Sequence, residues 1–259
     1  MSELMGMLWI ELKKATRSRM ILWTVLASLL MPFGIAFLIF VSKNPEISQK
    51  LGLINAKANL VAYAATDWPT YTGFFGQIIG AGGFILSVFV ISWVFGREFS
   101  DGTVKDMLAV PVQRSSILLA KFILVAAWSW LLTGVIYSTG LLIGIFLKLP
   151  GASYAALIHG GVVVAVTAFL LVPVVIPFAL FASLGRGYLL PIAIAALALM
   201  LINLAMIIGR GEYFPWAIPM IFAQGETSLG LMNYAIVFLT GLVGMIVTYL
   251  WWMHADQSR

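Results

Sequence analysis

Charged side chains that could pair with groups on another protein concentrate in one stretch of this chain, residues 96–121. Charged residues make up only 10% of the 259 residues, so their clustering is informative. Carboxylate and guanidinium groups form strong, directional hydrogen bonds with groups of opposite charge. The chemistry available here is therefore recognition of a charged surface. The seven charged residues in or beside the stretch are Arg97, Glu98, Asp101, Lys105, Asp106, Arg114 and Lys121.

Side chains that catalyse reactions or hold metals are scarce. The chain has no cysteine, which excludes thiolate metal sites and cysteine nucleophiles. Its two histidines, His159 and His254, give little support for a metal site or a Ser-His-Asp arrangement. No Gly-Lys pair occurs, so the phosphate-binding loop of ATPases is missing. The sequence predicts no enzyme and no directly bound cofactor, and any ATP-driven work must come from a partner.

The elements that position these residues are membrane-spanning helices. Apolar residues make up 62% of the chain, well above the usual share in soluble domains. Six apolar stretches without Asp, Glu, Lys or Arg are each long enough to cross a bilayer as a helix. We therefore expect an all-α, polytopic membrane protein in which residues 1–259 form a single transmembrane domain. The six expected spans are residues 21–41, 74–95, 122–147, 155–182, 189–208 and 232–252.

The cations predict the orientation of these spans. With six spans, ten Lys and Arg residues fall on the side of the termini and five on the other side. Cytoplasmic loops retain positive charge, so both termini are expected inside a bacterial-type plasma membrane. The net charge of +5 then reflects topology and does not require a nucleic-acid partner. A five-span alternative with one interfacial segment would place the C-terminus outside.

The expected spans contain no Lys or Arg, and all ten acidic residues are expected in loops or tails. Ion-coupled carriers usually hold ionisable groups within the membrane, where they bind and release the driving ion. His159 is the exception, and it fits an interfacial hydrogen-bonding residue better than a proton carrier. The sequence therefore disfavours an ATP-independent secondary carrier or channel.

The first 20 residues predict an amphipathic helix. At 100° per residue its apolar and charged residues fall on opposite sides, except for Ile10. Such a helix can lie among lipid headgroups with its cations near anionic lipid, and as an elbow it could pass motion into the first span. The apolar side holds Leu4, Met5, Leu8, Trp9, Leu12 and Ala15, and the charged side holds Glu3, Lys13, Lys14 and Arg17.

The loop from 96 to 121 predicts a short, rigid helix between the second and third spans. Val104, Met107 and Leu108 form an apolar stripe at helical spacing, and the Val110-Pro111 pair ends it. The loop resembles that of the permease subunits of type-2 ATP-binding-cassette exporters, including bacterial peptide-antibiotic exporters. The residues that match this family in order are Glu98, Gly102, Thr103, Leu108, Pro111, Arg114 and Lys121.

The resemblance implies a separate ATPase subunit, in two copies, that binds ATP and magnesium and docks on this coupling loop. It also implies a second permease copy, most simply a homodimer. Arg97 and Arg114 would face carboxylates of the ATPase, Glu98 would face a basic group, and Met107 and Leu108 would be the apolar anchor.

By the same resemblance, the second and fifth spans would line the transport path. Gln77 and Asn203 are their amide side chains, each equally suited to bonding a neighbouring helix. Residues 209–231 fit the re-entrant helix that precedes the last span in this family, although an interfacial belt fits equally well.

Glycine and proline spacing within the spans leaves two questions open. Gly76 with Gly80, and Gly140 with Gly144, allow close helix approach, either within one chain or between two copies. Pro173 and Pro177 lie one turn apart and bend the fourth span, more simply as a static kink than as a moving hinge.

The sequence therefore favours the membrane half of an ATP-driven exporter. Its apolar spans suit an amphiphilic substrate, such as a peptide antibiotic, a lipid or a hydrophobic drug. The alternatives are an ATP-independent secondary carrier or channel, and a membrane anchor or sensor whose loop recruits a cytoplasmic regulator.

Overall fold

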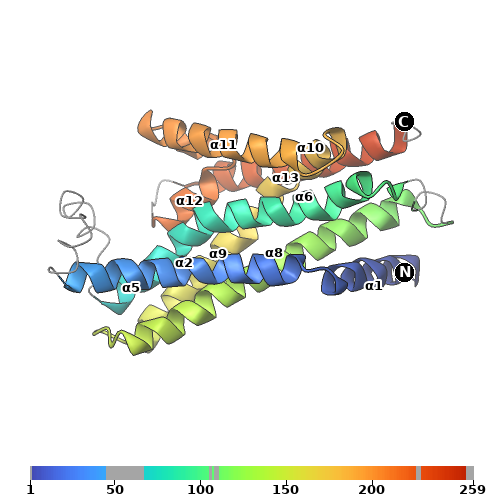
Figure 1. The fold of residues 1–259 in the computed structure, drawn as a ribbon. Helices are drawn as coiled ribbons and strands as arrows, with labels where there is room; N and C mark the ends of the chain where they lie inside the picture. Colours follow the sequence, from blue (N-terminus) through green and yellow to red (C-terminus); the bar gives the residue numbers. More distant parts are fainter. Residues whose placement is uncertain (1, 45–66, 105–106, 108–110, 226–228, 255–259) are drawn as a thin grey trace.

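The computed structural model describes residues 2–44, 67–104, 107, 111–225 and 229–254. It is all-helical and contains six helices or helix pairs long and apolar enough to cross a membrane, as the sequence predicted. They lie side by side as a bundle, and both termini lie at the same end (Figure 1), called the terminal end below. The spans are α2 (Met20–Lys43), α5–α6 (Trp68–Ser100), α8 (Arg114–Phe146), α9–α10 (Tyr154–Leu184), α11 (Leu189–Ile207) and α13 (Leu231–His254).

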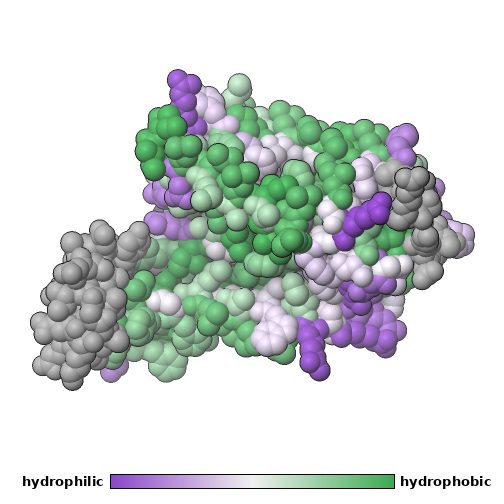
Figure 2. All heavy atoms as spheres, turned by 45° about the horizontal axis from the view of Figure 1, so that its top comes forward, coloured by the Kyte–Doolittle hydropathy of each residue, from purple (hydrophilic) through white to green (hydrophobic). Residues whose placement is uncertain are grey.

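The surface of the bundle fits this placement. Figure 2 shows apolar side chains over its middle and hydrophilic ones gathered toward its ends. The helix α1 (Ser2–Arg17) precedes α2 at the terminal end and packs along α8. The interfacial position expected for α1 stays a prediction.

Several helices extend beyond the apolar stretches. The α6 helix (Phe84–Ser100) continues past Glu98, and α8 begins at Arg114, so Lys121 lies at the start of its third turn. Residues 101–113 connect the two helices, a shorter connection than the expected loop of 96–121. A charged residue therefore marks the end of the apolar stretch but not the end of the helix. The helices continue because charged residues such as Glu98 and Lys121 have partners within the chain.

The second span has an irregular middle. Residues Trp68–Ile78 form α5, Ile79–Gly83 form a short π-helix, η2, and α6 follows. The first turn of α5 is capped, because the Thr70 N–H donates to Asp67 Oδ1 at 3.0 Å. Along its length this span packs against α9 through α5 and against α8, α10 and α11 through α6. It is the most buried of the six spans.

Glycines let aromatic rings of α5 pack into α8. A Cβ added at Gly144 would lie 2.7 Å from both Trp68 and Tyr71, and one at Gly140 would overlap Phe75. The Tyr71 hydroxyl donates to the Gly140 carbonyl at 2.9 Å. Because side chains of the same chain occupy the space beside these glycines, the glycine spacing serves packing within the chain.

The second glycine pair does the same on another face of the second span. A Cβ at Gly76 would meet Val163 at 2.8 Å, and one at Gly80 would meet Met220 at 3.1 Å. Met220 belongs to α12 (Ile218–Ala223), which lies within the segment 209–231 and packs against α9 and α5. The apolar middle of that segment is therefore buried in the bundle.

The fourth span breaks at its prolines. The α9 helix (Tyr154–Val175) contains Pro173, and Pro177 precedes α10 (Phe178–Leu184). The Val174 carbonyl at the break accepts a hydrogen bond from Trp216 Nε1 at 2.8 Å. Both prolines pack closely against glycines of α13. A Cβ added at Gly241 would lie 2.8 Å from Pro173, so close packing holds the break in place.

Candidate functional site

Four charged side chains meet in a buried cluster at the terminal end of the bundle, where α1, α6 and α8 converge. Glu98 Oε1 accepts hydrogen bonds from both Lys14 Nζ and Lys121 Nζ, each at 2.9 Å. Glu11 contacts the same two cations, at 2.8 Å from Lys14 and 3.4 Å from Lys121. These residues, called the charge cluster, join three helices that are far apart in sequence.

The side chains of the charge cluster are buried, so their charges need partners within the protein. The side chains of Lys121, Glu11 and Glu98 are 1%, 3% and 6% exposed. Removing charges from water costs several kcal/mol per ion unless partners compensate, so each of these ions depends on the others. Lys121 Nζ has a third partner, the Val94 carbonyl at 2.9 Å. Glu98 and Lys121 lie in helices that continue beyond the expected apolar spans, and their mutual pairing makes their burial tolerable.

Lys14 lies at the edge of the charge cluster and is about one-third exposed. Burial by itself lowers the pKa of Lys14, but the carboxylates of Glu98 and Glu11 outweigh that effect and raise the pKa above its ordinary value. Lys14 is therefore fully charged at neutral pH and stabilises the cluster from its solvent side.

The α1 helix packs on the bundle through three buried residues, of which only Ala15 belongs to its expected apolar side. Its buried residues are Met7, Glu11 and Ala15, at a spacing of four, which pack along α8. Met5 and Trp9 remain 66% and 64% exposed and are free to contact lipid. Sequence reasoning missed Glu11 and Lys14 as site residues, although their spacing of three on one helix face was a usable signal.

The connection that follows α6 begins with a well-formed helix stop. Gly102 has φ +70°, the left-handed conformation that glycine adopts without strain. The Thr103 N–H donates to the Glu98 carbonyl at 2.9 Å and the Gly102 N–H to the Phe99 carbonyl at 3.3 Å. These two bonds form a Schellman motif, so Gly102 ends α6 and turns the chain out of the helix.

Two arginines of the candidate site are engaged within the chain. Arg97 Nε pairs with Asp101 Oδ2 at 3.0 Å, and its guanidinium lies 5.0 Å from the Trp93 ring centroid. Arg114 Nη1 donates to the Trp252 carbonyl at 2.6 Å, which satisfies an end carbonyl of α13. Arg114 thereby ties the start of α8 to the end of the last span.

The remaining loop residues divide by exposure. Thr103 and Pro111 are exposed, whereas Met107 is 9% exposed and belongs to the core of the chain. Leu108 lies outside the described residues, as do Lys105 and Asp106, so the short helix expected around them stays a prediction.

A cavity of ≈ 390 Å³ opens between α1 and the segment that follows α6. Two buried polar atoms beside it, Glu98 Oε2 and Arg97 Nη1, have no hydrogen-bond partner among the described residues. Buried polar atoms normally find partners, so this pair marks a place where another group can bind. The cavity is lined by Met7, Ile10, Lys14, Arg97, Glu98, Asp101, Thr103 and Met107.

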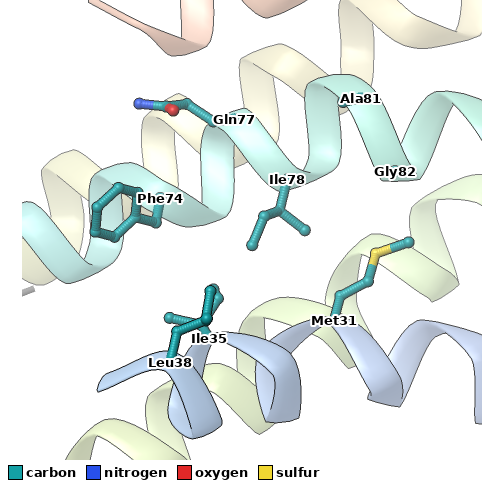
Figure 3. Close-up of a pocket in the computed structure, with 8 residues that line it drawn as sticks. All are labelled: Met31, Ile35, Leu38, Phe74, Gln77, Ile78, Ala81 and Gly82. Atoms are coloured by element: carbon teal, nitrogen blue, oxygen red, sulfur yellow. The ribbon is translucent and has the colours of Figure 1, made fainter. Parts of the chain in front are cut away.

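The two expected path residues lie away from the charge cluster. Gln77 is part of α5 and is half-buried, with its amide directed away from α2 (Figure 3). Asn203 is exposed on α11, and its amide donates to the Leu199 carbonyl of its own helix at 2.8 Å. The α11 helix packs on α6 and α10 and α5 packs on α9, so the fold does not gather these two amides into one site within the chain.

These features define a multi-pass helical membrane protein whose buried charged groups flank the connection between its second and third spans. Among the described residues, no three acidic or histidine side chains come together in a way that could hold a metal ion. A family model described as "ABC-2 family transporter protein" matches residues 7–203, which is most of the chain. The chain belongs to this family of transporter permeases.

A named relative supports the same assignment. The bacitracin transport permease protein of Bacillus licheniformis is 30% identical over 169 residues, covering 62% of this chain and 80% of that protein. In this family the permease is the transmembrane, non-catalytic subunit, and a partner ATPase hydrolyses ATP. The predictions of an ATP-binding-cassette permease without enzymatic activity are therefore confirmed.

Proposed function

We propose that this protein is the membrane half of an exporter for an amphiphilic substrate, driven by two copies of a separate ATPase that dock at the terminal end. The observation that carries this proposal is the charge cluster. It fixes both helices that flank the 101–113 connection, and it fixes α1 to them. Force applied to the connection would therefore reach α1 and the first span as well as the second and third.

The docking surface comprises the whole connection and its flanks. Thr103 and Pro111 contact the ATPase directly. A polar side chain of the ATPase enters the cavity where Arg97 and Glu98 each have an atom without a hydrogen-bond partner among the described residues. Lys121 and Arg114 hold the helix ends, and Gly102 sets the direction of the chain. The proposed coupling set remains Arg97, Glu98, Gly102, Thr103, Met107, Leu108, Pro111, Arg114 and Lys121.

The transport path forms between two copies of the chain. The α11 helix is the least buried span and exposes Leu197, Met200 and Leu204, so it suits contact with a second permease copy. In such a homodimer Asn203 would face the partner, and Gln77 would lie on the adjoining second span. The named relative transports bacitracin, a peptide antibiotic, which supports an amphiphile as substrate. Both termini lie on the cytoplasmic side of a bacterial-type plasma membrane.

A paired insertion tests the coupling role. Two glycines inserted after Thr103 should abolish stimulation of the ATPase by substrate, because a flexible connection no longer transmits force. The matched control is the same insertion after Gly151, in the connection between α8 and α9 at the opposite end. Both variants should insert into the membrane normally. Full stimulation in the Thr103 variant would refute the docking site.

Two other functions make different predictions. A secondary carrier or channel would transport substrate when the ATPase gene is deleted. An anchor or sensor would bind the ATPase or a kinase without moving any substrate. Uptake and efflux of a labelled amphiphile in inverted vesicles, with and without the ATPase and ATP, distinguish all three.

A further inference from the structure

An apolar groove of ≈ 400 Å³ lies between α2 and the first half of the second span, within the membrane-spanning part of the bundle (Figure 3). Its volume falls in the range of roughly 300–1,000 Å³ that is typical of small-molecule sites. Gln77 is the one polar side chain among its described lining residues. The lining consists of Met31, Ile35 and Leu38 from α2, and Phe74, Gln77, Ile78, Ala81 and Gly82 from the second span.

The groove exists because the two helices part from one another. The two helices are in contact where the Met31 side chain packs against Gly82. A Cβ added at Gly82 would lie 2.6 Å from Met31 Cε. Gly82 is in the π-helix η2, which interrupts the regular helix at that point. From there α5 packs on α9, whereas α2 packs on α8. The space between α2 and α5 is the groove.

The surroundings of the groove decide what fills it. Both walls belong to helices that cross the membrane, and α2 beside the groove exposes Phe33, Phe37 and Phe40. This continuous apolar surface faces hydrocarbon in a bilayer. A polar ligand would need several hydrogen-bond partners, and the walls offer only the Gln77 amide, which is directed away from α2. An acyl chain needs none.

We propose that the groove is a binding site for one acyl chain of a bilayer lipid, which completes the packing between α2 and α5. The chain enters from the leaflet opposite the terminal end, past Leu38 and Phe74, and its methyl end lies against Met31 and Gly82. This site is separate from the ATPase docking surface, so the inference does not depend on the proposed exporter function.

Photochemical labelling tests the site. The intact protein is reconstituted in nanodiscs of phosphatidylglycerol that contain a trace of lipid with a diazirine midway along one acyl chain. After irradiation, mass spectrometry should find label on Met31, Ile35 and Ile78 at several-fold the yield found on the lipid-facing residues of α13. Ala81→Phe fills the groove and should reduce that label several-fold. Ala127→Phe, the same change at an exposed position of α8, should leave it unchanged.

Thermal unfolding gives a second measurement that does not depend on labelling. The wild type should lose thermal stability when lipid is stripped in detergent and regain it when phosphatidylglycerol is added. Ala81→Phe should respond less, because its ring occupies the groove. Leu38→Trp, which narrows the entrance from α2, serves if Ala81→Phe does not fold.

Three results would overturn the proposal. The first is label spread evenly over all lipid-facing helices. The second is an undiminished label at Ile78 in a folded Ala81→Phe variant. The third is displacement of the groove label by micromolar bacitracin, the peptide antibiotic that the relative transports, since that would make the groove a substrate site.

Discussion

At the terminal end, α1, α6 and α8 are joined by four charged side chains, whereas at the opposite end α5 and α8 are joined by aromatic rings set against glycines. The aromatic contact consists mainly of close packing of rings against glycines, with one hydrogen bond from Tyr71 to the Gly140 carbonyl. The charge cluster has a few short, directional bonds in a buried setting, where losing one partner leaves another ion exposed to a low-dielectric environment. The terminal end therefore depends on mutual compensation of buried charges, and the opposite end on the close fit of rings against glycines.

The largest effect is expected from removing the central cation. Lys121→Met leaves Glu98 and Glu11 with Lys14 alone, and breaking a buried pair in this way costs about 3–5 kcal/mol. Chemical unfolding in detergent micelles measures the loss.

A double variant distinguishes charge from packing at this site. Glu98→Leu combined with Lys121→Met replaces the pair with apolar groups, while Glu11 and Lys14 keep each other at 2.8 Å. Stability should recover to near that of the wild type, but ATPase coupling should not. A double variant as unstable as Lys121→Met would contradict the description of these two residues as a pair.

The next effect tests the opposite end. Gly144→Leu forces a side chain into the space that Trp68 and Tyr71 occupy, and overpacking of this kind costs about 1–3 kcal/mol. Gly134→Leu on the same helix is the control, because a Cβ there has no neighbour within 4 Å. Equal melting temperatures for the two variants would argue against glycine–aromatic packing as the basis of this end.

A smaller effect is expected at the helix stop beside the charge cluster. Gly102→Ala places a side chain on a residue with φ +70°, which costs about 1–2 kcal/mol. Gly134→Ala should instead stabilise α8 by up to about 1 kcal/mol, because alanine is the better helix former. The opposite signs, read from melting temperatures, separate a conformational requirement from a general preference for glycine. Gly102→Asn should lie nearer the wild type than Gly102→Ala.

The sequence was sufficient for the bundle but not for the charge cluster. Apolar stretches predict spans because a helix of about 20 such residues matches the bilayer, and all six were found. Glu11 and Lys121, in contrast, are 110 positions apart, and no local pattern states that they meet. A rule that ends spans at charged residues also places Lys121 outside the third span. In the structure Lys121 lies within α8, because distant residues neutralise its charge.

The glycine pairs show a similar limit. Their spacing predicts close approach, but only the fold shows that Gly140 and Gly144 receive rings of α5. The groove beside α2 follows from the π-helix at Ile79–Gly83. That irregularity changes the path of the helix without changing its hydropathy, so sequence reasoning about spans does not detect it.

The smallest effect separates the two ends by pH. The pKa of Lys14 is raised above its ordinary value of 10.5, because Glu98 and Glu11 outweigh the effect of burial. A raised lysine pKa contributes stability that is fully present below the unfolded-state pKa and is lost as pH rises through the folded-state pKa. The difference in melting temperature between wild type and Lys14→Met should therefore be constant from neutral pH to about pH 10 and shrink above it. The difference between wild type and Gly76→Leu should show no such decline, because the Val163 side chain that this glycine meets carries no titratable group. A Lys14 difference that already falls below pH 9 would mean that its carboxylate partners do not hold the proton in place, and the charge cluster would then be weaker than its geometry indicates.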